Sequence, residues 1–194
     1  MTATARPCAL VPIADGTEEI EAVCVIDVLR RAGVEVVVAC VGPGGVPATS
    51  PAVVASRGVR LTADVLLEDV AARDFDAIVL PGGLPGARHL RGSATLAAML
   101  TAQDRSGRLL AAICAAPVVV LQAHGLLRGR GATCFPGLAA EMDPVSRRDD
   151  TVVQDGNLLT SQGPGTALVF ALAIVGHLCG KQRRDEVAAQ LLLD

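Results

Sequence analysis

The segment "RLLAAICAAPVVVLQAHG" (residues 108–125) changes from a strand pattern to a helix pattern at Cys114. A side chain at such a turn is displayed at the end of the strand, and the amides of the following helix point towards it. The positive end of the helix dipole favours a thiolate, so we expect a lowered pKa for the Cys114 thiol. Cys114 is therefore a candidate nucleophile, and a buried, inert thiol is the alternative.

A second candidate is the last carboxyl of the acidic run "EEIE" at the start of a predicted helix. For Glu18 and Glu19 we expect ordinary complementation of the helix dipole. Glu21 shares a stripe with Val25 and Val28, which favours a carboxyl that points inwards beside the strand ends. Burial raises the pKa of a carboxyl, and a protonated Glu21 would donate a hydrogen bond to a thiolate or sulfinate. Dipole complementation remains the alternative for Glu21 as well.

Consecutive glycines follow a predicted strand in "PGGLPG". One interpretation is a turn that needs positive φ. The other is an oxyanion pocket, in which Gly82 and the amides of Gly83 and Ala115 face a charge developing near the Cys114 sulfur. The segment lacks the spacing of a phosphate-binding loop.

The sequence shows neither a histidine next to Cys114 nor the residue spacing of a metal site. Cys114 is followed by alanine, and His124 lies at the far end of the next predicted helix, so a Cys-His-Asp hydrolase is not predicted. None of the six cysteines forms C-x-x-C or is spaced with a histidine like a zinc ligand. We therefore expect free thiols, no metal and no cofactor.

The composition limits the classes of protein that the chain can represent. Its 194 residues are 51% hydrophobic, which excludes a disordered polymer. With three Phe and no Trp or Tyr, the core must be aliphatic, and such a core is typical of a parallel sheet covered by helices. We expect one domain over residues 1–194. A net charge of -3 and the lack of a long basic run give no sign of nucleic-acid binding. No signal peptide is recognised and the apolar run 168–178 is too short to span a bilayer, so we expect a cytoplasmic protein.

Strand and helix patterns alternate along the chain. Strands are predicted at 8–13, 34–41, 75–83, 108–113 and, more briefly, near 131–134, 151–153 and 157–160. Helices are predicted at 17–33, 93–107, 116–125, 165–180 and 182–192. In the helix 17–33, Ile20, Val23, Cys24 and Val28 are placed on one apolar face. The alternation predicts an α/β fold with a doubly wound, mostly parallel sheet sandwiched by helices. Ligands of such folds bind at the carboxyl ends of the strands, where "ADGTEE", "PGGLPGA" and "CAAP" would meet.

Five segments carry a resemblance to a known family. "ALVPIADGTEEIEAV", "VASRGV", "DAIVLPGG", "LLAAICAAP" and "LLTSQGPGTALVFALAIV" resemble the ThiJ/PfpI superfamily, and within it the branch of the parkinsonism-associated deglycase and bacterial YajL. The resemblance runs along nearly the whole chain in order. It implies a flavodoxin-like fold, similar to the class I amidotransferases.

The resemblance also implies roles for individual residues. Cys114 matches the reactive, easily oxidised cysteine of the superfamily, and Glu21 matches the buried acid that hydrogen-bonds it. Gly83 and Ala115 match the amides of the oxyanion pocket. Arg57 resembles an arginine of the dimer interface close to the partner's site, so a homodimer is implied.

Three positions depart from the pattern. Ala115 stands where the peptidase-like branch carries histidine, which argues against proteolysis. Phe135 stands where the parkinsonism-associated branch has a histidine near the pocket mouth, and Ala55 stands where a second cysteine often lies. The departures leave the thiol–acid pair intact and bear on substrate preference.

The resemblance implies a cofactor-independent glyoxalase or deglycase. Its substrates would be small reactive aldehydes such as methylglyoxal and glyoxal, or the early adducts of these on proteins. The alternative is a redox-sensing stress chaperone that uses oxidation of Cys114 without essential turnover. A third hypothesis is an amidotransferase-like domain without chemistry.

Overall fold

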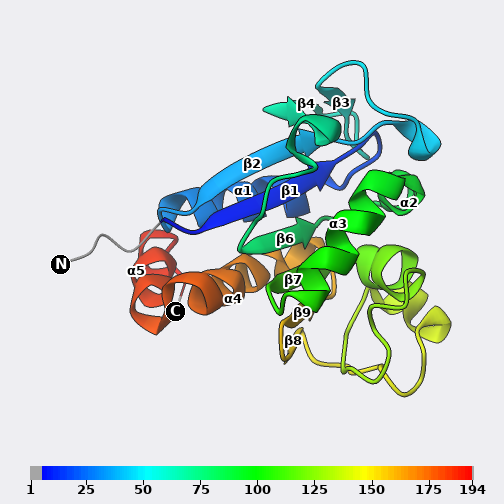
Figure 1. Cartoon of the computed structure of the whole chain (residues 1–194). Coiled ribbons are helices and arrows are strands. Elements are labelled where there is room, and N and C mark those ends of the chain that lie inside the picture. Colours follow the sequence, from blue (N-terminus) through cyan, green and yellow to red (C-terminus); the bar gives the residue numbers. More distant parts are fainter. Residues whose placement is uncertain (1–5, 194) are drawn as a thin grey trace.

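A seven-stranded sheet lies between two layers of helices in the computed structural model, which describes residues 6–193 (Figure 1). The strand order is β5-β2-β1-β6-β7-β9-β8. The parallel strands are β1 (Cys8–Ile13), β2 (Glu35–Cys40), β5 (Val65–Leu66), β6 (Ala77–Leu80), β7 (Leu109–Ile113) and β9 (Leu158–Ser161), and β8 (Val152–Asp155) runs antiparallel to β9. A separate hairpin joins β3 (Ala52–Val54) to β4 (Arg60–Thr62).

The helices cover the sheet on both faces. One layer holds α1 (Glu19–Arg31), α4 (Ala167–Cys179) and α5 (Lys181–Gln190), and both α1 and α5 pack against α4. The other holds α2 (Leu84–Gly92) and α3 (Ala94–Arg105), and Figure 1 shows α3 in front of the sheet and α1 behind it. The chain moves from β1 to β2, towards the β5 edge of the sheet, and from β6 to β7, towards the β8 edge. Because the crossovers between parallel strands are right-handed, these two directions put the helices on opposite faces of the sheet. The predicted doubly wound α/β fold is confirmed.

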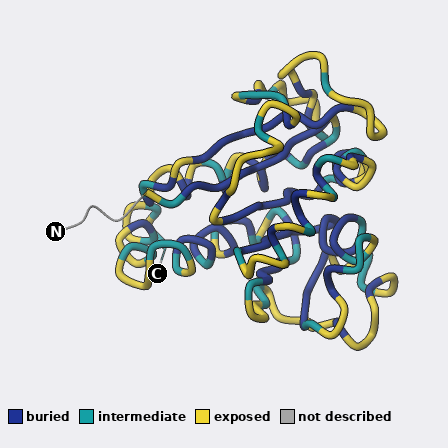
Figure 2. Tube along the Cα trace, viewed as in Figure 1, coloured by how far each residue is buried: buried dark blue, intermediate teal, exposed yellow. Residues whose placement is uncertain are grey.

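The core follows from this double covering. Every residue of β1 and β7 is buried, since a parallel strand between two helical layers has no solvent face (Figure 2). The largest fully buried side chain is Phe170, and leucine and isoleucine make up the others of that group. The aliphatic core expected from the composition is therefore present.

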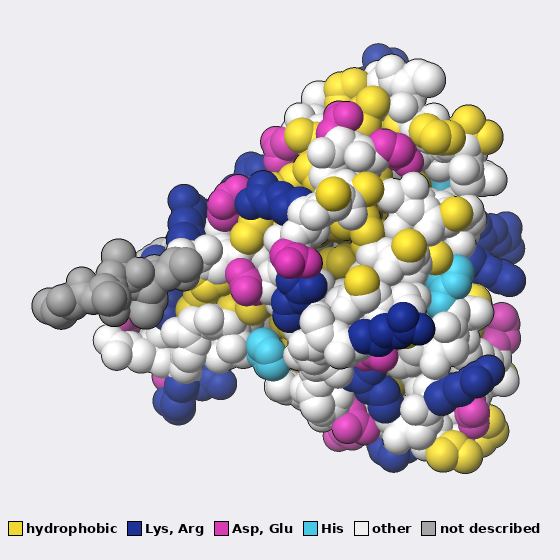
Figure 3. All heavy atoms as spheres, viewed as in Figure 1, with side chains coloured by type: hydrophobic (Ala, Val, Ile, Leu, Met, Phe, Trp, Pro, Cys, Tyr) yellow, Lys and Arg dark blue, Asp and Glu magenta, His cyan; other side chains and the backbone are white. Residues whose placement is uncertain are grey.

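The outer surface carries charges of both signs. Figure 3 shows basic and acidic side chains interspersed over the face that it draws. Among the described residues, no helix combines the length and the apolar character needed to cross a bilayer.

Three local predictions differ from the structure. The helix α2 was not predicted, because Pro85 and Gly86 suggested a loop, yet proline fits the first turn of a helix. The segment 131–134 forms only a single bridge, between Ala132 and Arg147. The helix expected after Cys114 is the short π-helix η3 (Pro117–Gln122).

The buried face of α1 also differs in part from the prediction. The stripe of Glu21, Val25 and Val28 is buried, as predicted. Ile20 and Val23 are 52% and 47% exposed, so their placement on the buried face is wrong. The helix turns the stripe that contains Glu21 towards the sheet and α4, which leaves the Ile20–Val23 side at the surface.

Candidate active site

Three loops meet at the carboxyl ends of neighbouring strands. The loop after β1 leads to Glu21, the loop after β6 holds Gly82 and Gly83, and Cys114 directly follows β7. The chain leaves β1 and β6 towards opposite faces of the sheet, and this is the point where open α/β sheets bind ligands. The structure thus brings five of the predicted site residues together: Glu21, Gly82, Gly83, Cys114 and Ala115.

The backbone of Cys114 adopts a left-handed conformation with φ of 65°. For a residue with a Cβ this conformation costs roughly 1–2 kcal/mol. It persists because both backbone groups are tied: the N–H donates to the Ser161 carbonyl (3.0 Å), and the carbonyl accepts from the Phe135 N–H (2.8 Å). The neighbouring strand and the segment before Phe135 therefore fix the position of the thiol.

Cys114 is 9% exposed, and its thiol lies beside Glu21. Burial and the negative charge of Glu21 raise the pKa of Cys114 to about 12, while the Gly83 and Ala115 amides, which donate hydrogen bonds to the sulfur, lower it. The expectation of a lowered pKa is therefore wrong in direction. The π-helix after Cys114 is short, and its dipole is outweighed by burial and the adjacent carboxylate.

Glu21 is completely buried, and burial raises the pKa of its carboxyl to about 7. One oxygen, Oε2, accepts the Gly82 N–H at 2.7 Å. This hydrogen bond and one with the Cys114 thiol lower the pKa of Glu21 but do not offset burial. The other oxygen, Oε1, has no hydrogen-bond partner among residues 6–193.

The two groups titrate as a unit. The charge of Glu21 raises the pKa of Cys114 only while the carboxyl is ionised. When Glu21 keeps its proton, the carboxyl no longer repels a thiolate and donates a hydrogen bond to it instead. Ionising both groups is disfavoured, so the pair holds one proton over a wide pH range above about 7. Below about pH 12, a thiolate at Cys114 therefore requires a protonated Glu21.

Glycine is required at position 82 because the site is tightly closed around it. A Cβ there would lie 2.7 Å from Cys114 Cβ and 2.8 Å from Glu21 Oε2. The Gly82 carbonyl also accepts the Glu18 N–H at 3.0 Å. At Gly83, φ of 81° favours glycine too. Both glycines hold the loop after β6 against the start of α1.

The acidic residues before Glu21 have specific structural roles. Glu18 is the N-cap of α1, and its Oε2 accepts the Glu21 N–H at 2.8 Å. Glu19 accepts from the Ser56 hydroxyl (2.7 Å) and from the Arg57 N–H (2.8 Å), which ties the β3–β4 hairpin to α1. The sequence predicts only an interaction of Glu19 with the helix dipole, so these two hydrogen bonds are additional to the prediction.

The structure does not bring Arg57 to the thiol of its own chain. Arg57 lies in the turn of the β3–β4 hairpin and is exposed. It does not line the pocket at Cys114. Its predicted place near a partner's site stays a prediction.

A pocket of about 200 Å³ opens over the sulfur. It is lined by Leu84, Cys114, Ala115, Phe135, Gly137 and Leu138. The sequence drew attention to Phe135 but not to Leu84 or Leu138. A leucine directly after the "PGG" turn was the signal for Leu84, while nothing in the pattern distinguished Leu138.

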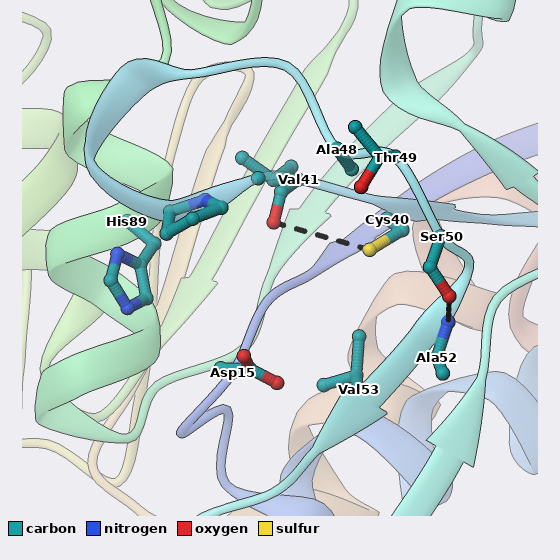
Figure 4. Close-up of a pocket in the computed structure, with 11 residues that line it drawn as sticks. Asp15, Cys40, Val41, Ala48, Thr49, Ser50, Ala52, Val53 and His89 are labelled. Carbon is teal, nitrogen blue, oxygen red and sulfur yellow. Dashed lines mark hydrogen bonds between the residues drawn. The ribbon is translucent and has the colours of Figure 1, made fainter.

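A different pocket, of about 170 Å³, contains none of the predicted site residues (Figure 4). Two of its polar side chains hold loops: Asp15 Oδ1 accepts the Val54 N–H (2.8 Å), and His89 Nδ1 accepts the Gly44 N–H (3.1 Å). Within residues 6–193, no group of three or more His, Cys, Asp or Glu is placed to hold a metal ion.

Comparison with known proteins relates the whole chain to one family. The sequence profile of the DJ-1/PfpI family matches residues 8–177. The chain is 50% identical over 187 residues to Protein DJ-1 homolog B of Arabidopsis thaliana. This alignment covers 96% of the chain but only 41% of that relative. The chain is 38% identical over 195 residues to a Caenorhabditis elegans protein named Glutathione-independent glyoxalase DJR-1.2, with 100% of this chain and 99% of the relative covered. The chain spans less than half the length of that Arabidopsis relative (41%) and of Protein DJ-1 homolog A of the same species (46%).

Solved structures agree with the sequence relatives. Toxoplasma gondii DJ-1, in a structure described as oxidized, matches with a TM-score of 0.92 and 44% identity over 96% of this chain and 98% of that one. Drosophila melanogaster DJ-1beta matches with a TM-score of 0.90 and 45% identity over 97% and 99% of the two chains. Profile, sequence and fold coincide over nearly the whole length, and the chain therefore belongs to the DJ-1/PfpI family.

Proposed function

We propose that the chain is a glyoxalase that uses Cys114 as its nucleophile and needs no cofactor. Its substrates are methylglyoxal, glyoxal or their early adducts on proteins, and its products are the corresponding hydroxy acids. The observation that carries the proposal is the thiol of Cys114 beside the buried carboxyl of Glu21 and next to the amides of Gly83 and Ala115. The glyoxalase name of the Caenorhabditis elegans relative supports the same activity.

The first step joins the sulfur to the aldehyde. The Cys114 thiolate attacks the aldehyde carbon, a C–S bond forms, and the π electrons of the carbonyl move onto its oxygen. The amides of Gly83 and Ala115 donate to this oxyanion, as preorganised donors do in acyl transfer. Glu21 donates its proton to the oxygen, which leaves a hemithioacetal on Cys114 and a carboxylate on Glu21.

The second step moves hydrogen from one carbon to the next. The Glu21 carboxylate takes the proton from the hemithioacetal carbon, and the electron pair of that C–H bond forms an enediolate with its negative charge on the neighbouring oxygen. The hydroxyl proton of the hemithioacetal passes to that oxygen, and Glu21 returns its proton to the neighbouring carbon as the thioester carbonyl forms. The product is a thioester of the hydroxy acid on Cys114. Water cleaves the thioester, so methylglyoxal plus water becomes lactic acid and the thiol is regenerated. A carboxyl with a pKa of about 7 is suited to both directions of proton transfer.

Loss of the nucleophile tests the proposal. In Cys114→Ser we expect the formation of lactate from methylglyoxal to fall at least about a hundredfold, because a serine hydroxyl is far less ionised and less nucleophilic than a thiol. Cys134→Ser is the matched control, since Cys134 is also a buried free thiol but does not line the Cys114 pocket. A Cys114→Ser protein that forms lactate at the parental rate would overturn the proposal.

A second candidate function is redox sensing through Cys114. The oxidised state in which the Toxoplasma gondii relative was solved favours it. The thiolate and two molecules of hydrogen peroxide would give a sulfinate and two of water, and a protonated Glu21 with the Gly83 and Ala115 amides would hold the sulfinate oxygens. Peroxide titration read by peptide mass tests this: Cys114 should oxidise before the other five cysteines, and equal oxidation of all six would contradict the role.

A homodimer is part of the proposal. Ile20 and Val23 on α1, Val54 and Val59 on the β3–β4 hairpin, and Val169 on α4 are exposed large apolar residues. These three elements adjoin, because Glu19 ties the hairpin to α1 and α1 packs on α4. Two copies related by a twofold axis would cover the same residues on each. The exposed Arg57 in this hairpin is consistent with such an arrangement.

A further inference from the structure

We infer that the mouth of the Cys114 pocket selects α-oxoaldehydes with an apolar substituent, aryl or branched alkyl, over glyoxal. Leu84 and Phe135 are the residues that set this preference. The inference rests on the proposed function and specifies its substrate class.

The lining of the pocket is the first observation. No charged side chain contributes to it: beyond the thiol, its side chains are those of Leu84, Ala115, Phe135 and Leu138. Its volume of about 200 Å³ corresponds to roughly seven molecules of liquid water, which is more room than a methyl group occupies. An apolar surface of this kind gains free energy when an apolar group displaces water from it.

The exposure of the two residues at the mouth is the second observation. Leu84 is 40% exposed and Phe135 is 45% exposed, whereas Cys114 below them is 9% exposed. Large apolar side chains are thus kept in contact with solvent directly above the sulfur. A substrate substituent bound between them would cover apolar area that the free protein leaves in water.

Both side chains are fixed to the reacting centre by short backbone connections. Leu84 directly follows Gly83, whose amide faces the sulfur. The Phe135 N–H donates to the carbonyl of Cys114 at 2.8 Å. The phenyl ring fits against glycines, because a Cβ at Gly137 would lie 2.8 Å from the ring and one at Gly163 would lie 3.6 Å from it.

The reaction geometry directs the substituent towards these side chains. In the proposed mechanism the aldehyde carbon sits at the sulfur and its oxygen faces the Gly83 and Ala115 amides. Glu21 and the sheet close the inner side, since Glu21 is fully buried. The remaining direction for the second carbon and its substituent is the mouth. Glyoxal has only hydrogen there, methylglyoxal a methyl group and phenylglyoxal a ring.

Kinetics with two aldehydes test the inference. We expect the ratio of kcat/KM for phenylglyoxal to that for glyoxal to fall about tenfold or more in Phe135→Ser and in Leu84→Ser, the scale on which apolar pockets discriminate. Phe135→Leu keeps an apolar side chain and should retain most of the ratio. Val145→Ser is the matched control, because Val145 is 72% exposed and does not line this pocket. An unchanged ratio in both serine variants, with turnover intact, would overturn the inference and leave the proposed function standing.

Alkylation of Cys114 provides a readout that needs no turnover. The rate of Cys114 alkylation is measured with N-phenyl iodoacetamide and with iodoacetamide, and each rate is divided by the rate at which the same reagent alkylates glutathione. The ratio of the first normalised rate to the second should exceed one in the parental protein and fall towards one in Phe135→Ser. A chain that turns over no α-oxoaldehyde contradicts the proposed function, and with it the substrate preference. An alkylation ratio that is the same in parental and Phe135→Ser proteins contradicts selection at the mouth.

Discussion

At the scale of single residues, Cys114 combines backbone strain with burial. Its positive φ places the thiol beside Glu21 and the amides of Gly83 and Ala115. Strained backbone of this kind costs free energy that the rest of the fold must offset. Holding the sulfur atom in this position therefore lowers the stability of the folded chain.

The cost of this strain is measurable with two variants that both lack the thiol. Cys114→Gly should unfold with a free energy about 1 kcal/mol higher than Cys114→Ala, because only glycine adopts positive φ without a steric penalty. Urea denaturation of the two proteins at one pH provides the comparison. Equal stabilities would show that the backbone is not strained at this residue.

Glu21 predicts a pH dependence of stability. Its pKa is about 7 in the folded chain and near the ordinary value of 4.5 when unfolded, so between these pH values the folded chain holds a proton that the unfolded chain has lost. The free energy of unfolding therefore falls as pH rises from 5 to 8, by on the order of 3 kcal/mol from this group. Glu21→Gln should lack this part of the slope. Parallel slopes in urea denaturation of the two proteins would contradict a raised pKa.

The sequence predicted these two residues but not the protonation of their pair. A strand-to-helix junction identified Cys114, and the stripe with Val25 and Val28 identified an inward Glu21. The pKa of Cys114 depends on how closely the carboxyl approaches the sulfur, which is set by three loops distant in sequence. Helix-dipole reasoning about one segment therefore gave the wrong direction.

At the scale of elements, the site depends on the loops after β1, β6 and β7. The strands were predictable from continuous apolar runs, because parallel strands under two helical layers are buried throughout. The helix α2 was not, since Pro85 and Gly86 punctuate its first turn. The segment 131–134 has strand-like residues but pairs through one bridge only. Its neighbour Phe135 nevertheless reaches the pocket.

The loop after β6 can be tested by adding one methyl group. Gly82→Ala places a Cβ within 3.0 Å of the Cys114 sulfur, so the thiol or the Glu21 carboxyl must shift. We expect kcat/KM for methylglyoxal to fall about a hundredfold, the usual cost of misplacing a reacting group by about 1 Å. Gly165→Ala is the control, because no atom lies within 4 Å of the added Cβ there. Parental activity in Gly82→Ala would contradict the close packing around the pair.

At the scale of the whole molecule, the exposed apolar residues on α1, the hairpin and α4 are the feature that a single chain leaves unexplained. The sequence placed Ile20 and Val23 in the core because a helical stripe shows which residues share a face, not which face turns inwards. A second copy would account for their exposure, and the fold itself needs no partner to bury its core.

The association state tests this interpretation. Sedimentation equilibrium of the parental chain should give twice the chain mass of 19.8 kDa. Val54→Lys should shift the equilibrium towards monomer, because it buries a charge in the apolar interface. Val145→Lys adds the same charge at a residue 72% exposed and outside the proposed interface, and should remain dimeric. A parental chain that sediments as a monomer, or a Val54→Lys protein as dimeric as its parent, would contradict the proposed interface.

The central claim is that Cys114 and Glu21 share one proton, and titration of the Cys114 thiolate tests it most directly. Ultraviolet absorbance, taken as the difference from Cys114→Ser, should show the parental thiolate forming partly in a first step near pH 7 and completely only near pH 12. Glu21→Gln has no second acid, so its thiolate should form in a single step. A single step near the free-cysteine value of about 8.5 in both proteins would contradict the account.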